Sequence, residues 1–188
     1  MIKNEKLDDC RRMCLWIDEI PDDCEYTRES SVHRYEANKA IKWFNGIICL
    51  ELRIAARDAS NYAMLNFKFT GDNSGIFNVS IKNGGENRRV ISNIAAPKDI
   101  VSNGIVQKYE KVLIAVFDQL SEEKIFPEGT LEILGGRCGV VGTSPIAVAI
   151  VAQILIELFK LGEQLAETNV KGLIMERCKR EVFHCKSE

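Results

Sequence analysis

The alternation of apolar and polar positions in the middle of the chain predicts a β-meander. In IICLELRIAAR, residues 47–57, apolar side chains occupy every second position, which is typical of a half-buried strand. NYAMLNFKF, residues 61–69, repeats this alternation, and IFNVSIK, residues 76–82, follows after the turn TGDNSG. We therefore predict three antiparallel strands. A second turn, NGGEN, leads into residues 88–94, which are long enough for a fourth strand or an irregular edge.

Helical spacing dominates the second half of the chain. An apolar stripe with spacings of three and four predicts a helix over residues 99–120. The turn FPEG and the strand TLEILGG, residues 130–136, follow it. Residues 144–166 then predict a long helix that is apolar on nearly all sides in its first half, so we expect it to be the most buried one. Ser144 is its predicted N-cap, and Pro145 fits the first helical position, where a missing N–H costs nothing.

Both ends of the chain are predicted to contain helices. Residues 7–16 have helical spacing, with apolar side chains on one side and most charged ones on the other, and this helix is expected to end near Pro21. Residues 35–43 fit either a second short helix or the approach to a strand. At the other end, residues 170–184 predict a final, charged helix.

The order of these elements predicts an α+β fold in two layers. A mostly antiparallel sheet of four to five strands would carry the helices 104–120 and 144–166 on one face. A chain of 188 residues is near the usual size of one domain and can bury its own core. Within this single domain we expect an N-terminal helical segment (1–46), an α/β core (47–168) and a C-terminal helical tail (169–188).

Composition and charge narrow the classes of function. The net charge is −2, from 25 basic and 27 acidic residues, so the chain lacks the global positive field that drives non-specific binding to nucleic acid. Its first residues are too charged for a signal peptide, and no apolar run reaches the length of a membrane span. Seven cysteines, an odd number, fit reduced thiols. These features predict a cytoplasmic protein with no membrane partner.

Signatures of catalysis and metal binding are sparse. The two histidines lie outside any cysteine or serine nucleophile signature. Cys10 and Cys14 are four residues apart, and Cys178 and Cys185 are seven apart, whereas soft-metal sites usually use a tight CxxC spacing. Buried thiols that act as small hydrophobes explain these cysteines more simply. We therefore predict no catalytic residue, no metal and no cofactor.

The glycine-rich stretch GGRCGVVGTS, residues 135–144, is a candidate site for an anion. Glycines let backbone amides approach a ligand closely, and the predicted helix start behind them directs free amides and the positive end of the helix dipole at it. The candidate binding residues are Gly136, Arg137, Gly139, Gly142, Thr143 and Ser144. Among these, Arg137 is expected to supply positive charge. The alternative is a turn that only joins a strand to a buried helix.

Residues 63–158 resemble domain IV of elongation factor G, which belongs to a β-α-β superfamily shared with ribosomal proteins and small-molecule kinases. The matching pieces are AAPKDIVSNGIVQKYEKVLIAVFDQL, FPEGTLEIL and GTSPIAVAIVAQIL, which follow the order of elements in that domain. The chain lacks both a GxxxxGK[ST] phosphate loop and the RGxYGH-type segment of that family. The resemblance therefore implies the fold of that domain without GTPase activity. We expect the chain to bind neither GTP nor ATP.

Two functions follow from these observations. The first is a non-enzymatic interaction or binding module with a translation-factor-like domain, in contact with RNA or a ribosome-associated protein partner, as the resemblance implies. The second is a small enzyme or ligand-binding protein that uses residues 135–144 for an anionic ligand. Self-association through an exposed helix or sheet face is a third use of the same fold. The scarcity of residue patterns typical of catalysis favours the first function.

Overall fold

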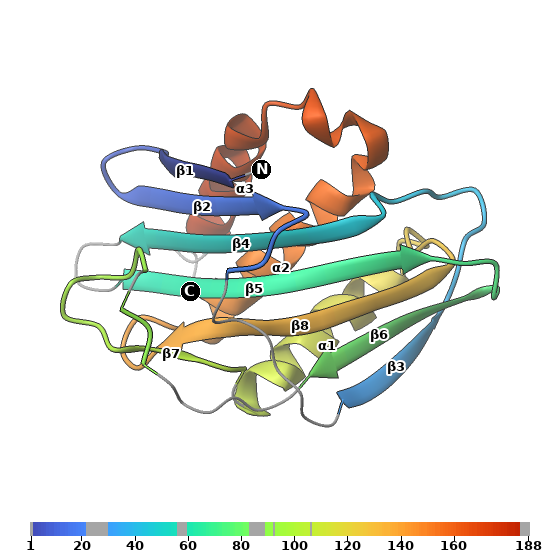
Figure 1. The fold of residues 1–188 in the computed structure, drawn as a ribbon, viewed down its shortest axis with the longest axis horizontal. Helices are drawn as coiled ribbons and strands as arrows, with labels where there is room; N and C mark the ends of the chain where they lie inside the picture. The colour runs from blue at the N-terminus through green and yellow to red at the C-terminus, as the bar shows by residue number, and fades with distance from the viewer. Residues whose placement is uncertain are drawn as a thin grey trace.

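In the described part of the chain, one sheet of eight strands carries the helices on one of its faces (Figure 1). The computed structural model describes residues 2–21, 30–55, 60–82, 89–91, 93–105 and 107–184. The strands are β1 (Ile2–Lys6), β2 (Arg11–Ile17), β3 (Ser30–Glu36), β4 (Gly46–Ala55), β5 (Ser60–Gly71), β6 (Ile76–Lys82), β7 (Val101–Asn103) and β8 (Gly129–Gly139). The helices are α1 (Gln107–Ser121), α2 (Pro145–Lys160), the 3-10 helix η1 (Gly162–Ala166) and α3 (Val170–His184). The predicted α+β class and mostly antiparallel sheet are confirmed, but the predicted number of four to five strands is wrong.

β8 lies inside the sheet, which runs in the order β1-β2-β4-β5-β8-β6-β3. One edge of β8 pairs antiparallel with β5, and the other pairs parallel with β6 and antiparallel with β7. The predicted meander is therefore correct for β4 and β5 but wrong for β6, because β8 separates β6 from β5. The link between β5 and β6, residues 72–75, is long enough for this, since two strand spacings measure only about 10 Å.

The prediction of an N-terminal helical segment over 1–46 is wrong, because the described part of this segment contains β1, β2 and β3. Most of residues 7–16, predicted as a helix, belong to β2, which pairs with β1 and β4. The side chains of Met13, Leu15 and Ile17 are buried against the helices, with a period of two. So short an apolar pattern fits both periods, and pairing with a distant strand decides between them.

The helices of the second half differ from the predictions mainly at their ends. α1 begins only at Gln107, because residues 101–103 form β7 against β8. The helix predicted over 144–166 ends at Lys160 and continues as η1. α3 covers the predicted range 170–184. The predicted helical tail is thus confirmed over that range.

The face of the sheet toward the helices holds the main core. α2 has ten buried residues, which agrees with the prediction of a deeply buried helix. A group of aromatic rings joins the helices to the sheet: the rings of Phe77 and Phe126 stack with centroids 4.4 Å apart, and Trp43 packs against Phe77. Because apolar burial stabilises a fold by about 25 cal/mol per Å², this face supplies most of the driving force.

Two chain segments cover parts of the opposite face. Ile20, in the connection that follows β2, packs against Cys49 and Met64. At one end of the sheet a small second core contains Tyr62, Val90, Ala95 and Val101. The described part of the segment 88–94, expected to be a fourth strand or an irregular edge, makes a single bridge from Arg89 to Ser102. It is an irregular cover of this face.

We predict that Gly136→Ala destabilises the fold by about 1 to 3 kcal/mol, because a new Cβ would collide with the Met64 carbonyl oxygen. Gly71→Ala is the matched control in a paired strand, since its Cβ would meet nothing nearer than 3.6 Å. Urea unfolding midpoints of both variants test this. Equal losses of stability would show that the close approach at Gly136 is unimportant.

Candidate functional site

The six predicted anion-binding residues do not form one loop. Gly136, Arg137 and Gly139 belong to β8, while Gly142 and Thr143 lie in the turn that follows. Ser144 caps α2: its Oγ accepts a hydrogen bond from the Ala147 N–H at 3.1 Å, and Pro145 is the first helical residue, as predicted. The strand predicted over residues 130–136 extends to Gly139, because β5 and β7 pair with β8 there.

The Arg137 side chain does not lie at the start of α2, where it was expected to supply positive charge for an anion. Arg137 is opposite Met64 in β5, and Met64 is opposite Glu51 in β4, so the three share one face of the sheet. Leu65 and the other main-core residues of β5 point to the face that α2 covers. The Arg137 guanidinium is buried, with Nη1 3.9 Å from Glu51 Oε1. Its charge already has a buried counter-charge.

The backbone amides of the β8–α2 turn are held by a carboxylate of the protein itself. Asp99 Oδ1 accepts a hydrogen bond from the Val141 N–H at 3.0 Å, and its Oδ2 accepts one from the Gly142 N–H at 2.9 Å. The glycine-rich turn thus binds an anionic group, and that group is Asp99. Sequence reasoning missed Asp99, which lies 42 residues before Val141 and carries no local signal of this contact.

Two further side chains, Thr143 of the turn itself and Tyr109 of α1, hold the rest of the turn. Thr143 Oγ1 accepts from the Gly139 N–H at 2.7 Å and donates to the Tyr62 carbonyl oxygen at 2.6 Å. The Tyr109 hydroxyl donates to the Thr143 carbonyl oxygen at 2.7 Å. The amides of Gly139, Val141 and Gly142 therefore already have acceptors. Anion binding by the six residues stays a prediction, and an external anion would have to displace Asp99 or Thr143.

A second group of polar side chains is buried around Glu51, on the face of the sheet that lies opposite the helices. Its Oε1 accepts hydrogen bonds from the Tyr62 hydroxyl at 2.7 Å and from the Ile94 N–H at 3.3 Å. Cys14 lies directly opposite Glu51 in the register of β2 and β4. With Arg137, these residues join β2, β4, β5 and β8 to the segment that covers them. Glu51 showed in the sequence only as one polar position of an alternating strand.

The environment of Glu51 shifts the pKa values of the groups around it. Burial raises the pKa of Glu51, and the hydrogen bond from Tyr62 and the charge of Arg137 oppose that rise. Burial, reinforced by Glu51, raises the pKa of the Cys14 thiol to about 12 and holds the pKa of Tyr62 well above its usual range. A thiol in this state is a poor nucleophile. The hydrogen bond from the Ile94 N–H to Glu51 attaches the segment around Ile94 to the sheet.

The other sequence-predicted features give no further site. Within the ranges that the structure describes, no group of three or more His, Cys, Asp or Glu side chains is placed to hold a metal ion. Cys178 is buried in α3, and Cys185 lies outside the described residues. Among the described helices, none is both long and apolar enough to cross a membrane.

Exposed apolar side chains gather where β8 turns into α2. Of the seven large hydrophobic side chains that are exposed in the described residues, five lie here, and together they are named the aliphatic corner: Ile91, Ile100, Val140, Val141 and Ile146. The Val140 N–H donates to the Ile100 carbonyl oxygen at 3.0 Å, and the bridge from Arg89 to Ser102 places Ile91 beside Ile100. The same turn is the one that Asp99 and Thr143 hold.

No protein family, no curated protein and no solved structure matches this chain.

We predict that Cys14 resists alkylation in the folded protein at pH 8, because its thiol is buried and has a pKa of about 12. Cys10, four residues earlier, is exposed and serves as an internal control that should react readily. Mass spectrometry of peptides after timed labelling with iodoacetamide measures both. Labelling of Cys14 as fast as Cys10 would contradict the arrangement around Glu51.

We predict that Asp99→Asn loosens the β8–α2 turn, because an amide side chain offers one acceptor oxygen where the carboxylate offers two. The loss should be about 1 to 2 kcal/mol of unfolding free energy. Hydrogen exchange of the Val141 and Gly142 amides should become faster, while strand amides in β4 keep their protection. Unchanged exchange at both turn amides would exclude this role of Asp99.

Proposed function

We propose that this protein is a non-enzymatic interaction module that binds a protein partner through the aliphatic corner. The observation that supports this most directly is the clustering of exposed apolar side chains on a turn whose backbone is held from several sides. Val141 is 85% exposed and Val140 is 74% exposed, although each N–H of these residues is hydrogen-bonded to the segment 99–100. Contiguous exposed apolar surface of this kind is typical of interaction sites.

A rigid corner is favourable for binding because little conformational freedom remains to be lost. Ordering a flexible side chain or loop at an interface costs about 0.5 to 1.5 kcal/mol for each immobilised side chain. Valine and isoleucine are stiff at χ1, and the turn that carries Val140 and Val141 is already ordered. Full burial of each such side chain stabilises a complex by about 1.5 to 3 kcal/mol. A few of them therefore suffice for a specific contact.

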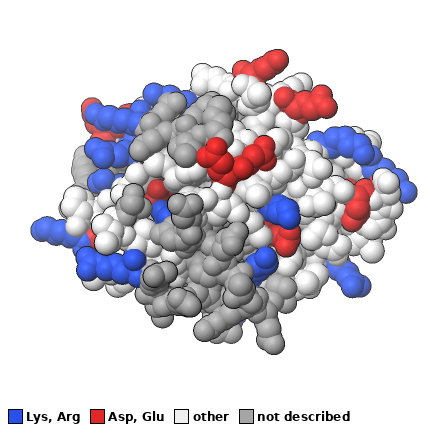
Figure 2. All heavy atoms as spheres, in the orientation of Figure 1, with Lys and Arg blue, Asp and Glu red and all other residues white. Residues whose placement is uncertain are grey.

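The charges around the corner indicate the chemistry of the partner. Arg89 and Lys98 are exposed beside it. The neighbouring carboxylate of Asp99 is bonded to the turn amides. Figure 2 shows the open sheet face of Figure 1, with several Lys and Arg groups along its left side. We therefore expect an apolar recess edged by acidic groups on the partner.

RNA fits the corner less well than a protein does. Binding of unpaired bases usually relies on exposed aromatic rings, and the exposed large hydrophobic side chains in the described ranges are all Val or Ile. The nearby Tyr109 is buried, and the net charge of the chain is −2. A protein partner is therefore favoured over RNA.

The resemblance to domain IV of elongation factor G stays part of this proposal. Within residues 63–158, β5, β6, α1, β8 and α2 follow one another in the order on which the resemblance rests. Under it, the partner would be a ribosome-associated protein. The alternative, a small enzyme or ligand-binding protein that uses residues 135–144 for an anion, is less favoured because the amides there already have acceptors.

We predict that a photo-crosslinking amino acid at position 141 captures one discrete protein in extracts of the source cells. The matched control is position 32, where Val32 is 56% exposed and lies in β3 at the far edge of the sheet. Excess unlabelled wild-type protein should compete with the crosslink, and the double variant Val140→Asp, Val141→Asp should not. Because both side chains are exposed, this variant should keep the unfolding midpoint of the wild type.

Three outcomes of this experiment would count against the proposal. Crosslinks of equal yield and identity from positions 141 and 32 would indicate non-specific contact. Competition by the aspartate variant as strong as that by the wild type would exclude the aliphatic corner. Capture of a product that ribonuclease removes would favour the RNA-binding alternative over a protein partner.

A further inference from the structure

Three cationic residues lie side by side across three neighbouring strands of the sheet, and they are named the cation row. Lys6 in β1 is directly opposite Arg12 in β2, and Arg12 is directly opposite Arg53 in β4. The row belongs to the face opposite the helices, because its members alternate with main-core residues such as Met13 and Leu52. Directly opposite residues have Cβ atoms about 4.5 to 5.5 Å apart, so the three side chains leave the sheet next to one another.

This arrangement is unfavourable for the sheet itself. Like charges directly opposite each other destabilise the pairing of two strands. Lys6 has one exposed ion pair, with Asp9 Oδ1 at 2.7 Å, and such a pair contributes little in water. Within the described residues, the Arg12 and Arg53 guanidinium groups have no ion-pair partner, and Arg53 Nε has no hydrogen-bond acceptor. The described carboxylates therefore leave the charge of these two arginines without a counter-charge.

The buried carboxylate of β4 does not serve the cation row. Glu51 is two residues before Arg53 and lies on the same face of the sheet. Its Oε1 is 3.9 Å from Arg137 Nη1, and it accepts hydrogen bonds from the Tyr62 hydroxyl and the Ile94 N–H. Glu51 is thus engaged by groups outside the row. This leaves the guanidinium groups of the row available to an external anion.

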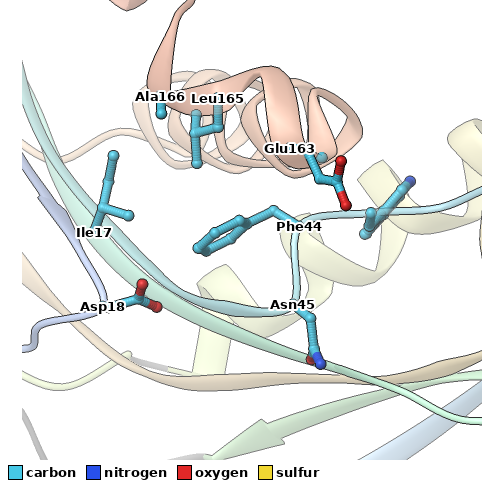
Figure 3. A pocket seen from close by; sticks show the side chains of 9 residues that line it. Ile17, Asp18, Phe44, Asn45, Glu163, Leu165 and Ala166 are labelled. Atoms are coloured by element: carbon cyan, nitrogen blue, oxygen red, sulfur yellow. The ribbon is translucent and has the colours of Figure 1, made fainter.

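Positive and negative groups are separated along β2. The strand begins with Arg11 and Arg12, and Figure 2 shows Lys and Arg atoms gathered at the upper left, where Figure 1 places the β1–β2 turn. At the other end of β2, Figure 3 shows the carboxylates of Asp18 and Glu163. In a chain with a net charge of −2, this separation favours the approach of an anion at the end that carries the row.

Two neighbouring guanidinium groups fit a phosphate. Each guanidinium is planar and can donate two parallel hydrogen bonds to an oxyanion. A phosphate monoester carries a charge of about −1.5 to −2 at pH 7 and three acceptor oxygens, so one phosphate can accept from both Arg12 and Arg53. Clusters of arginine are a recurring means of recognising phosphorylated groups. A carboxylate, with two oxygens and one charge, would neutralise the pair less completely.

We propose that the cation row binds a phosphate monoester. Arg12 and Arg53 donate to its oxygens, and Lys6 adds positive charge from β1. A phosphorylated residue of a protein and a small phosphorylated metabolite both carry this group, and the phosphate dianion is the chemistry that they share. The row includes no residue of the aliphatic corner, so this proposal is independent of the partner proposed there.

The first experiment titrates phenyl phosphate into ¹⁵N-labelled protein and follows the arginine Nε–H signals by ¹H–¹⁵N NMR. The signals of Arg12 and Arg53, assigned with Arg12→Gln and Arg53→Gln, should shift saturably. The signal of Arg34, an exposed arginine of β3 at the other edge of the sheet, should stay in place. Affinity should rise between about pH 5 and about pH 7, because the second pKa of a phosphate ester is about 6. Sulfate, a dianion throughout this range, should show no such rise.

Two substitutions test the arginines. Arg12→Gln and Arg53→Gln should each weaken phenyl phosphate binding at least about tenfold, the loss expected for a charge-assisted hydrogen bond. Each should also raise the midpoint of urea unfolding, because it removes repulsion between like charges. Arg34→Gln is the matched control and should change neither quantity. Weaker binding together with a more stable fold distinguishes a binding arginine from a structural one.

Two further probes distinguish the sources of the phosphate. A short phosphoserine peptide and glycerol phosphate carry the same monoester group on different bodies. Tighter binding of the peptide assigns the cation row to a phosphorylated protein. Tighter binding of glycerol phosphate assigns it to a small metabolite.

The proposal is overturned by any of four results. The first is a shift of the Arg34 signal as large as those of Arg12 and Arg53. The second is an affinity that neither Arg12→Gln nor Arg53→Gln changes. The third is binding of benzoate as tight as that of phenyl phosphate. The fourth is a loss of binding that accompanies a lower unfolding midpoint in both variants, which would be a structural effect.

Discussion

The rest of the structure depends on the insertion of β8 between β5 and β6. An internal strand satisfies its backbone groups on both edges, and β8 does so with β5 on one side and with β6 and β7 on the other. This insertion places Leu131 and Ile133 in the main core. It also brings the end of β8 beside β7, so that the turn into α2 meets the segment that carries Asp99.

Two carboxylates then attach residues 89–91 and 93–101, which cover part of the sheet face opposite the helices, to the rest of the protein. Asp99 accepts from the turn after β8, and Glu51 in β4 accepts from the Ile94 N–H and the Tyr62 hydroxyl. A buried carboxylate is costly unless hydrogen bonds and an opposite charge compensate it, and Arg137 provides that charge for Glu51. The open face thus acquires a stable cover without a helix.

The same contacts leave polar side chains buried around Glu51 and aliphatic side chains exposed at the turn after β8. Burial raises the pKa values of Glu51 and of the Cys14 thiol. The turn that Asp99 holds keeps aliphatic side chains exposed, where association with a partner would remove them from water.

Local pattern alone determined a large part of this protein. The alternation in β4, β5 and β6, the Ser144 cap with Pro145, and the range of α3 were all readable, because a side-chain period or a cap depends on neighbours within a few residues. Tertiary structure decided that residues 11–17 form a strand, that β8 enters between β5 and β6, and that Asp99 takes the turn amides. It also decided that Arg137 faces Glu51 and not a ligand. Each of these outcomes depends on a contact with a residue far away in the sequence, which pairs with a strand edge, a backbone amide or a buried charge. The local sequence around each group does not indicate which distant residue this is.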